Sequence, residues 1–274
     1  MPIKKFFKII PLDIFEGMRH ISSTANPEIK HLLQIIEKSK SRRQEQLFAV
    51  EGERLLSRAI ACGYTVVSIY CLPETVEHWH PYSNNIIIVN PNIMSRISVM
   101  QYDVVAILKQ KNHNLDDSFA IESKGICLVL SGLEKPGNIG AILRTADASG
   151  VNSIFISSEN ADLYNPHCLR NSTGAIFGID IALGDARDIV RHLHNIAMPI
   201  YTTHLEATHN YTDIDYRQGA AIVMGTEAIG VDDYWVDSAS VCIKIPMKGV
   251  ADSLNVSTSA AVILYEALRQ RSLS

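Results

Sequence analysis

An alternation of strand and helix patterns fills the chain from residue 126 onward and constrains the fold more than any other feature. Short β-branched runs predict buried strands, and segments with apolar residues three and four apart predict amphipathic helices between them. This alternation is typical of an α/β fold with a parallel sheet, which binds ligands in loops at the carboxyl ends of its strands. The strands are expected at 126–130, 151–157, 200–203, 221–224 and 241–245, and the helices at 139–149, 186–197 and 258–269.

The first part of the chain predicts a second, smaller α/β unit, with helices at 29–36 and 53–61 and strands at 66–71, 86–89 and 104–108. A length of 274 residues, 47% of them hydrophobic, is enough for two cores. The polar segment between the units has no periodicity and is expected to be a linker. The predicted organisation is an N-terminal extension at 1–20, a small α/β domain at 21–108, a linker at 109–124 and the parallel-sheet domain at 125–274.

Composition and short motifs exclude several classes of site. The five cysteines form no C-x-x-C pair, which argues against structural zinc and against a disulfide framework. The two His-x-His pairs lack further ligands, so no metal is expected. No apolar run approaches the roughly 20 residues that span a bilayer, and a cytoplasmic protein is expected. Neither GxxxxGK[ST] nor GxGxxG occurs, which argues against nucleoside triphosphates and ordinary dinucleotide cofactors.

The charge is unevenly distributed along the chain. Residues 1–58 hold 11 of the 25 Lys and Arg and 7 of the 29 Asp and Glu, so that this part carries +4 and the rest of the chain −8. The densest point is the cluster of Lys38, Lys40, Arg42 and Arg43. A basic region of this kind indicates an anionic partner such as nucleic acid, and the alternative is a solvated helix face.

The loop after the first strand of the parallel sheet carries two candidate residues. Asn138 is placed either to cap the helix that follows or to act in a site. Arg144 lies further along the same helix among apolar and small residues, and its guanidinium is expected to face a specific acceptor. The stretch from Gly137 to Gly140 also fits the GxxG pattern of KH modules, although here it follows a strand.

Two further loops follow strands of the same sheet. The first runs from Gly225 to Gly230 and offers a close backbone approach together with the Glu227 carboxylate. The second runs from Ile245 to Ser257, where Asn255 and the residues after it open the last helix. The amide groups at that helix start are suited to an anionic group. Because parallel strands end at one edge of the sheet, the three loops are expected to form a single site.

Together the three loops resemble the signature motifs of the SpoU, or TrmH, family of RNA ribose 2′-O-methyltransferases in the SPOUT superfamily. Residues 21–108, with the stretch Phe48-Ala-Val-Glu-Gly-Glu53, are similar to the L30e-like substrate-binding domain that many members carry. A further stretch, Arg170-Asn-Ser-Thr-Gly-Ala175, departs from the family pattern at Asn171. The three motifs are Asn138-Ile-Gly-Ala-Ile-Leu-Arg144-Thr-Ala146, Met224-Gly-Thr-Glu-Ala-Ile-Gly230, and Ile245-Pro-Met-Lys-Gly with Ser253-Leu-Asn-Val-Ser257.

The resemblance implies a trefoil knot in the parallel-sheet domain, S-adenosylmethionine as methyl donor, RNA as substrate and a homodimer. It places the cofactor against backbone and apolar groups of Thr203, Gly225, Ile245, Met247 and Leu254. The implied active-site residues are Asn138, Arg144, Glu227, Ser253 and Asn255. The basic residues expected to hold RNA are Lys38, Lys40, Arg42, Arg43, Arg54 and Arg170.

Several alternatives stay open at this point. The chain could be a non-catalytic RNA-binding or ribosome-assembly protein that kept the fold, or a SPOUT enzyme that methylates a base. Glu227 is either a proton acceptor or an anchor for Arg144 and for loop amides. The appended N-terminal unit favours ribosomal RNA, whereas the stretch from Ile245 to Arg271 is similar to tRNA guanosine enzymes, so that the RNA class and the nucleotide are undecided.

Overall fold

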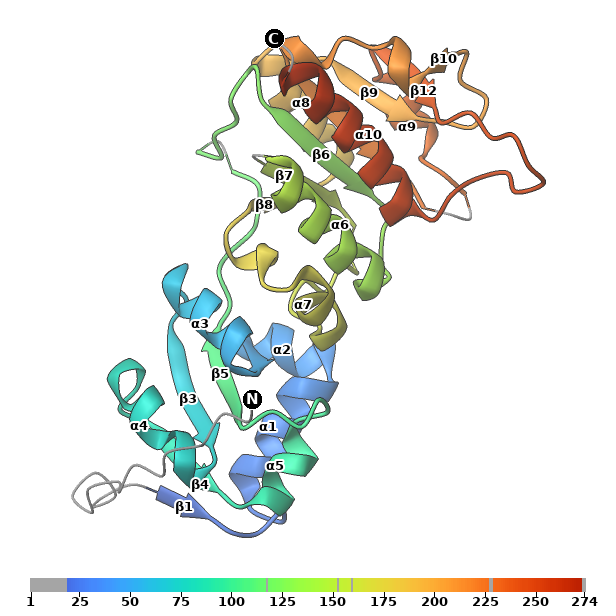
Figure 1. Cartoon of the computed structure of the whole chain (residues 1–274). Helices are drawn as coiled ribbons and strands as arrows, with labels where there is room; N and C mark the ends of the chain where they lie inside the picture. The colour runs from blue at the N-terminus through green and yellow to red at the C-terminus, as the bar shows by residue number, and fades with distance from the viewer. Residues whose placement is uncertain (1–18, 117, 152, 159, 227–228, 273–274) are drawn as a thin grey trace. The chain divides into compact units, whose positions relative to one another are not determined.

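The computed structural model describes residues 19–116, 118–151, 153–158, 160–226 and 229–272. The chain forms two compact units, and the division lies between Gln110 and Lys111 (Figure 1). Among the described residues, no helix is long and apolar enough to cross a membrane.

The N-terminal unit is built on a five-stranded sheet in the order β1-β4-β3-β5-β2 within the described residues. Strands β1, β4 and β3 are parallel, and β5 runs antiparallel to both β3 and β2. The predicted boundary of the N-terminal extension at residue 20 is too late, because β1 begins at Arg19 and pairs with β4 in this sheet. The strands are β1 Arg19–Ile21, β2 Leu47–Glu51, β3 Val66–Cys71, β4 Ile86–Val89 and β5 Val104–Lys109, and the helices α1 Pro27–Glu37, α2 Ser39–Glu45, α3 Glu53–Ala61, α4 Val76–Trp79 and α5 Pro91–Ile97.

Helix α1 shows how local sequence sets an element of this unit. The Asn26 side chain accepts a hydrogen bond from the Glu28 amide at 2.8 Å, and Pro27 occupies the first helical position. The apolar side chains three and four residues apart, Ile29 and Leu32 among them, are fully buried in the core of the unit. The predicted helix at 29–36 is confirmed, with two more residues at its start and one at its end.

Arg42 caps α1 from the following helix and corrects one expectation. Its side chain is only 1% exposed, and Nη1 donates hydrogen bonds to the carbonyl oxygens of Ile35 and Ile36, both at 2.8 Å. A buried guanidinium that serves two helix-terminal carbonyls cannot reach a phosphate of an RNA. The prediction that Arg42 binds RNA is therefore wrong, whereas Lys38, Lys40 and Arg43 are exposed.

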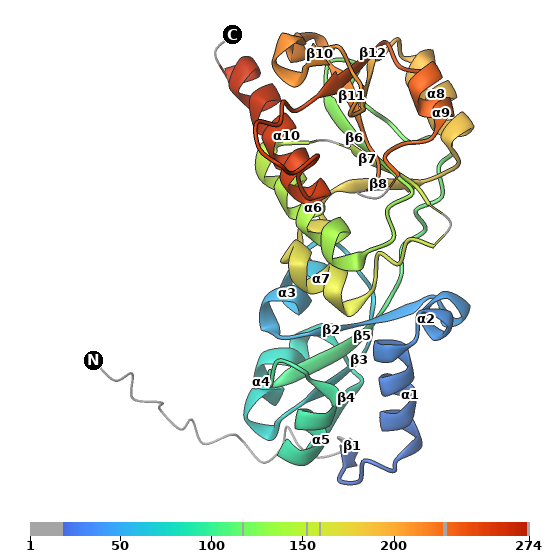
Figure 2. The same ribbon diagram turned by 90° about the vertical axis from the view of Figure 1, so that its right-hand side faces the viewer.

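The C-terminal unit holds a seven-stranded sheet in the order β10-β12-β9-β11-β6-β7-β8 within the described residues, and every adjacent pair is parallel. Figure 2 shows α6 and α10 on one face of this sheet and α8 and α9 on the other. The strands are β6 Ile126–Ser131, β7 Ser153–Ser157, β8 Asp180–Leu183, β9 Ile200–Thr203, β10 His209–Asn210, β11 Ala220–Met224 and β12 Val241–Lys244, and the helices α6 Pro136–Ser149, α7 Pro166–Ser172, α8 Ala186–Asn195, α9 Asp233–Asp237 and α10 Val256–Ser272.

Both faces of this sheet are covered, as its apolar sequence predicts. Every residue of β6 and of β11 is buried, which is the pattern of central parallel strands. On one face, Leu193 of α8 and Trp235 of α9 pack in a core with Val129 and Val223 from these two strands. The predicted parallel α/β sheet is confirmed.

The segment expected to be a linker differs from the prediction. Lys109 is the last residue of β5, and the chain from Lys111 onward belongs to the C-terminal unit. The Leu115 amide donates to the Leu183 carbonyl at 2.7 Å, and Phe119 packs against the core that α8 covers. The segment is polar because much of it lies on the surface, yet these contacts hold it to the edge strand β8.

Candidate active site

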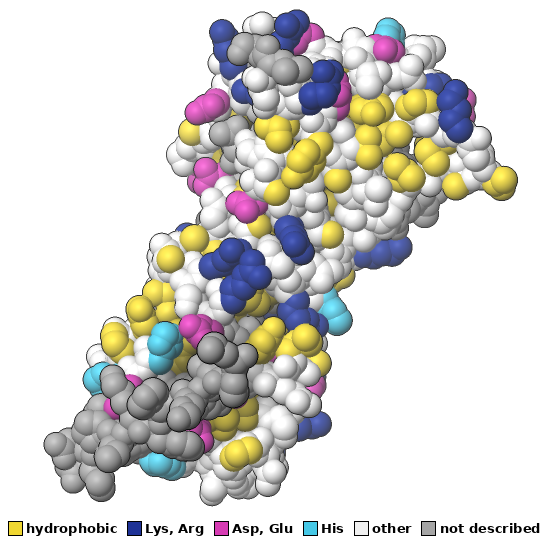
Figure 3. All heavy atoms as spheres, in the orientation of Figure 1, with side chains coloured by type: hydrophobic (Ala, Val, Ile, Leu, Met, Phe, Trp, Pro, Cys, Tyr) yellow, Lys and Arg dark blue, Asp and Glu magenta, His cyan; other side chains and the backbone are white. Residues whose placement is uncertain are grey.

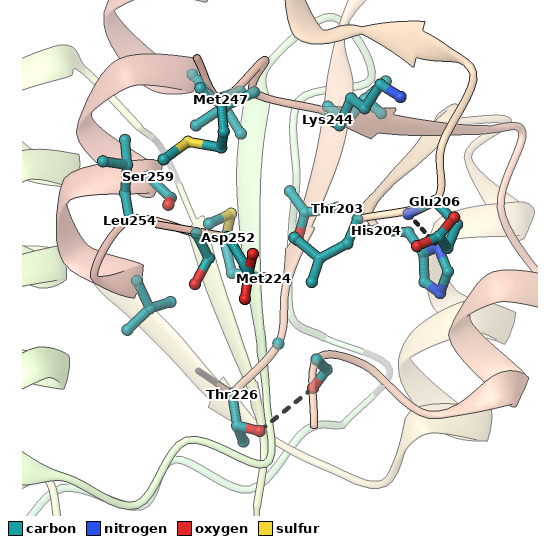
Figure 4. A pocket seen from close by; sticks show the side chains of 18 of the residues that line it. Thr203, His204, Glu206, Met224, Thr226, Lys244, Met247, Asp252, Leu254 and Ser259 are labelled. Atoms are coloured by element: carbon teal, nitrogen blue, oxygen red, sulfur yellow. Dashed lines mark hydrogen bonds between the residues drawn. The ribbon is translucent and has the colours of Figure 1, made fainter. Parts of the chain in front are cut away.

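Three loops meet at the carboxyl ends of β12, β9 and β11, which are neighbours in the sheet. Of the loops expected to form the site, those after β11 and β12 are among them, whereas the loop after β6 contributes none of the described lining residues. The three loops enclose a cavity of about 340 Å³ (Figure 4). The start of α10 closes it on one side. The lining residues are Thr203, His204, Leu205, Glu206, Met224, Gly225, Thr226, Ile229, Gly230, Ile243, Lys244, Ile245, Met247, Asp252, Ser253, Leu254, Val256, Ser259 and Ile263.

All five residues expected to bind the cofactor line this one cavity, namely Thr203, Gly225, Ile245, Met247 and Leu254. Apolar side chains from all three loops contribute to the wall, Met224 and Leu205 among them. The volume lies within the range of about 300–1,000 Å³ that is usual for small-molecule sites, and such sites are mostly apolar with a few polar groups. An adenosyl group, which combines a flat ring with polar edges, fits a lining of this kind.

The loop after β11 folds back tightly on itself. The amides of Thr226 and Gly230 each donate to the carbonyl of the other, at 2.8 and 3.0 Å. A Cβ atom at Gly225 would overlap the backbone of Gly230, so that a side chain there would force the loop apart. Thr203 Oγ1 donates to the Val223 carbonyl at 2.9 Å and ties the end of β9 to β11. The cavity wall at this point is therefore backbone held in a fixed shape.

Asn138 and Asn255 lie next to one another although they are 117 positions apart. Asn255 Nδ2 donates to Asn138 Oδ1 at 3.4 Å, and Asn255 Oδ1 accepts from the amide and the hydroxyl of Ser257 at 3.0 and 2.6 Å. Asn255 thus caps the start of α10, as expected. Asn138 does not cap α6, because that helix already begins at Pro136 and has Lys135 in the cap position.

The other candidate residues differ in their position relative to the cavity. Ser253 lines the cavity beside Leu254. Arg144 is exposed on α6, six residues after Asn138, and does not line the cavity. Glu227 lies outside the described residues. Arg170 is half-buried on α7, where its Nη2 lies 3.2 Å from His167 Nδ1.

The GxxG stretch serves helix packing. A Cβ atom at Gly140 would overlap the carbonyl oxygen of Cys168 in α7, so glycine lets the two helices approach closely. Asn171 Nδ2 donates to the Gly137 carbonyl at 3.1 Å and fixes the first turn of α6 against α7. A KH-like role for this stretch is therefore not supported.

Sequence reasoning did not single out four polar lining residues, His204, Glu206, Lys244 and Asp252. The first two follow β9 directly, and Lys244 ends β12, so their position at strand ends was the available signal. Asp252 precedes Ser253 in the recognised motif.

Comparison with known proteins identifies the class of this cavity. Residues 125–265 match the SpoU rRNA Methylase family, which is half of the chain. The chain belongs to the SpoU rRNA methylase family. Residues 26–102 match the MRM3-like substrate binding domain. Members of this family have a trefoil knot in the parallel-sheet domain, and they are methyltransferases. Their methyl donor is S-adenosylmethionine.

Three similar proteins match almost the whole chain. The 23S rRNA (guanosine(2553)-2′-O)-methyltransferase RlmP of Bacillus subtilis is 26% identical over 251 residues, which cover 90% of this chain and 98% of that protein. A crystal structure of an RNA 2′-O ribose methyltransferase is 33% identical, with a TM-score of 0.80, and the match covers 92% of this chain and 99% of that one. The AdoMet-bound rRNA methyltransferase of Sinorhizobium meliloti is 28% identical, with a TM-score of 0.85, and the match covers 92% of this chain and 98% of that one.

Proposed function

We propose that this protein methylates the 2′-hydroxyl of a ribose in 23S ribosomal RNA with S-adenosylmethionine as donor. The observation that carries the proposal is the single cavity lined by all five expected cofactor residues, with Ser253 on its wall. The solved relative with bound AdoMet, similar over 92% of this chain, supports the same ligand.

Bound in the cavity, the sulfonium supplies an activated methyl group, which the ribose oxygen attacks in line as the carbon–sulfur bond breaks. The neutral thioether leaves, and the hydroxyl proton passes to a base. With so good a leaving group, the work of the protein is to align the hydroxyl with the methyl group. We assign this alignment to Asn138, Asn255 and Ser253, which combine amide and hydroxyl groups next to the cavity.

We assign Arg144 to the phosphate of the target nucleotide. Removing a proton from a guanidinium at neutral pH costs roughly 7–9 kcal/mol, which makes this side chain a poor general base. Its planar fork suits bidentate contact with phosphate oxygens, and its exposure on α6 leaves it accessible to RNA. The proton then passes to water or to a phosphate oxygen, and Glu227 either accepts it or anchors the arginine.

Ribosomal RNA is favoured over tRNA as substrate. The relative named for 23S rRNA is similar across both units, and the N-terminal unit matches a substrate-binding domain. In this unit the exposed cations Lys38, Lys40, Arg43 and Arg54 are assigned to RNA phosphates, together with Arg170 of the other unit. A relative that acts on ribosomal RNA also supports the cytoplasm as the location.

A homodimer through the C-terminal unit is part of this proposal. Figure 3 shows hydrophobic side chains gathered over α10 and the segment that follows β12. Leu205, Ile229, Val250 and Tyr265 of this unit are between 50% and 101% exposed. Exposed apolar side chains that gather in one patch often mark a protein–protein contact. A second copy of the chain would cover such a surface. Sedimentation at several protein concentrations tests this, and a monomer at all of them would contradict it.

The experiment that tests the activity supplies labelled S-adenosylmethionine and 23S rRNA transcribed in vitro, which carries no modification. Complete digestion to nucleosides identifies the product. We expect one labelled 2′-O-methylnucleoside, lost with Arg144→Ala and reduced at least tenfold with Arg144→Lys, which keeps the charge but loses the bidentate fork. Near-full activity of Arg144→Lys would exclude the bidentate contact. Tight RNA binding with no label in any product would favour the alternative, a non-catalytic RNA-binding protein.

A further inference from the structure

The charges on the cavity wall are not balanced. Among the described lining residues, Glu206 and Asp252 carry carboxylates and Lys244 carries an ammonium group, which gives a formal charge of −1 with His204 neutral. A mostly apolar wall with a net negative charge favours a ligand with a net positive charge. The proposed donor has this charge, because its sulfonium adds +1 to the zwitterionic amino acid.

Asp252 is the carboxylate best placed to act on this ligand. It stands in the segment after β12, two residues before Leu254, and Figure 4 draws it among the side chains that line the cavity. Within the part of the chain that the structure describes, its carboxylate has no hydrogen-bonding or ion-pairing partner. The other carboxylate, Glu206, is drawn beside His204 in Figure 4, apart from Leu254, whereas Asp252 is drawn on the Leu254 side of the cavity. The negative charge of Asp252 is therefore available to a ligand.

We propose that Asp252 is a specificity-determining residue that makes the cavity prefer the cationic methyl donor over the neutral product. The inference rests on the proposed function. During transfer the carbon–sulfur bond breaks, the carbon–oxygen bond forms and the hydroxyl proton leaves, so the sulfur changes from a sulfonium to an uncharged thioether. The attraction to Asp252 is then lost, and product leaves the site more readily than donor.

Coulomb's law gives the expected contribution of the Asp252 charge to the binding of the methyl donor. Two unit charges about 6 Å apart at an effective dielectric constant of about 40–80, appropriate to an exposed carboxylate, change an equilibrium about 3- to 10-fold. Removal of the Asp252 charge should therefore weaken donor binding by this factor and leave product binding unchanged. The difference should shrink at high salt, because the carboxylate is exposed and its field is screened.

Isothermal titration of the full chain with S-adenosylmethionine and, separately, with S-adenosylhomocysteine tests this. For Asp252→Asn we expect the ratio of product Kd to donor Kd to fall about 3- to 10-fold. Asp180→Asn is the matched control, since Asp180 is an exposed carboxylate that begins β8, at the opposite end of the strands from the cavity. This variant should leave the ratio unchanged, and melting temperatures show whether both variants are folded.

Each outcome decides the matter. A ratio that falls only in Asp252→Asn supports the proposal. Equal losses for both ligands would overturn it, because the carboxylate would then contact a group that donor and product share. An unchanged ratio would also overturn it. If the unaltered protein binds neither ligand, the proposed function fails and this inference with it, whereas donor binding with an unchanged ratio leaves the proposed function standing.

Discussion

Asn255 combines two tasks that a single substitution can separate. Its Oδ1 caps α10, and its Nδ2 reaches Asn138. Asn255→Asp keeps an acceptor for Ser257 and suits a helix N-terminus, but it removes the Nδ2 donor. The Asn138 side chain must then turn its own Nδ2 toward the new carboxylate. We expect turnover to fall about 100-fold, the usual effect of removing one positioned donor. Chemical unfolding should show stability unchanged to within about 0.5 kcal/mol.

Asn255→Ala removes both functions, and loss of the cap should cost about 1 kcal/mol in addition. Asn195→Asp makes the same chemical change at the exposed end of α8 and serves as control for turnover. Full turnover in Asn255→Asp would contradict a role for the amide in alignment and would leave Asn255 as a helix cap only.

At the residue scale, the sequence identified the cofactor wall but not the charges on it. Glycine at 225 and the Ile-Pro-Met turn at 245 depart visibly from ordinary packing, and both line the cavity. Asp252 and Lys244 are ordinary surface residues by sequence alone. Only the folding of three distant loops around one space gives these charges a common ligand. The pairing of Asn138 with Asn255 likewise depends on α6 and α10 lying side by side.

Among the elements, α1 depends on a side chain that is not its own. Arg42→Ala removes two charge-assisted hydrogen bonds from the last turn of α1 and leaves the Ile35 and Ile36 carbonyls buried without this donor. We expect a loss of about 2–3 kcal/mol in the stability of the N-terminal unit, seen as faster hydrogen exchange in α1. Arg43→Ala is the neighbouring control and should change stability by less than about 0.5 kcal/mol, because Arg43 is exposed. Equal exchange rates in the two variants would show that the cap is not needed.

Elements with a clear local period were predictable, and elements fixed by distant partners were not. The helix at Glu53–Ala61 and the strands at Val66–Cys71 and Ile86–Val89 were predicted with the bounds that the structure has. Strand β2 was missed, because its five residues are stabilised by antiparallel pairing with β5, almost 60 positions later. Helix α6 starts two residues before Asn138 because proline fits a first helical turn, which moved the expected cap inside the helix.

At the scale of the whole molecule, the trefoil knot could not be predicted from the hydrophobic periodicity of the sequence. General rules of chain topology argue against knots, and only membership of the family carries this one. The parallel sheet, in contrast, followed from local patterns, because its central strands β6 and β11 are buried along their whole length and almost entirely apolar.

RNA binding by the whole molecule should be strongly dependent on salt. Each phosphate contact adds about 0.7–0.9 to the slope of log affinity against log salt. The double variant Lys40→Ala with Arg43→Ala should therefore lower the slope by roughly 1.4–1.8, measured by fluorescence anisotropy with a 23S rRNA fragment over a range of salt. Arg187→Ala removes an exposed cation outside the predicted set, and it should leave the slope unchanged. The Arg42→Ala variant should do the same if it stays folded, because the buried guanidinium releases no counterion on binding. A slope that falls with Arg187→Ala but not with the double variant would place the RNA contact elsewhere on the protein.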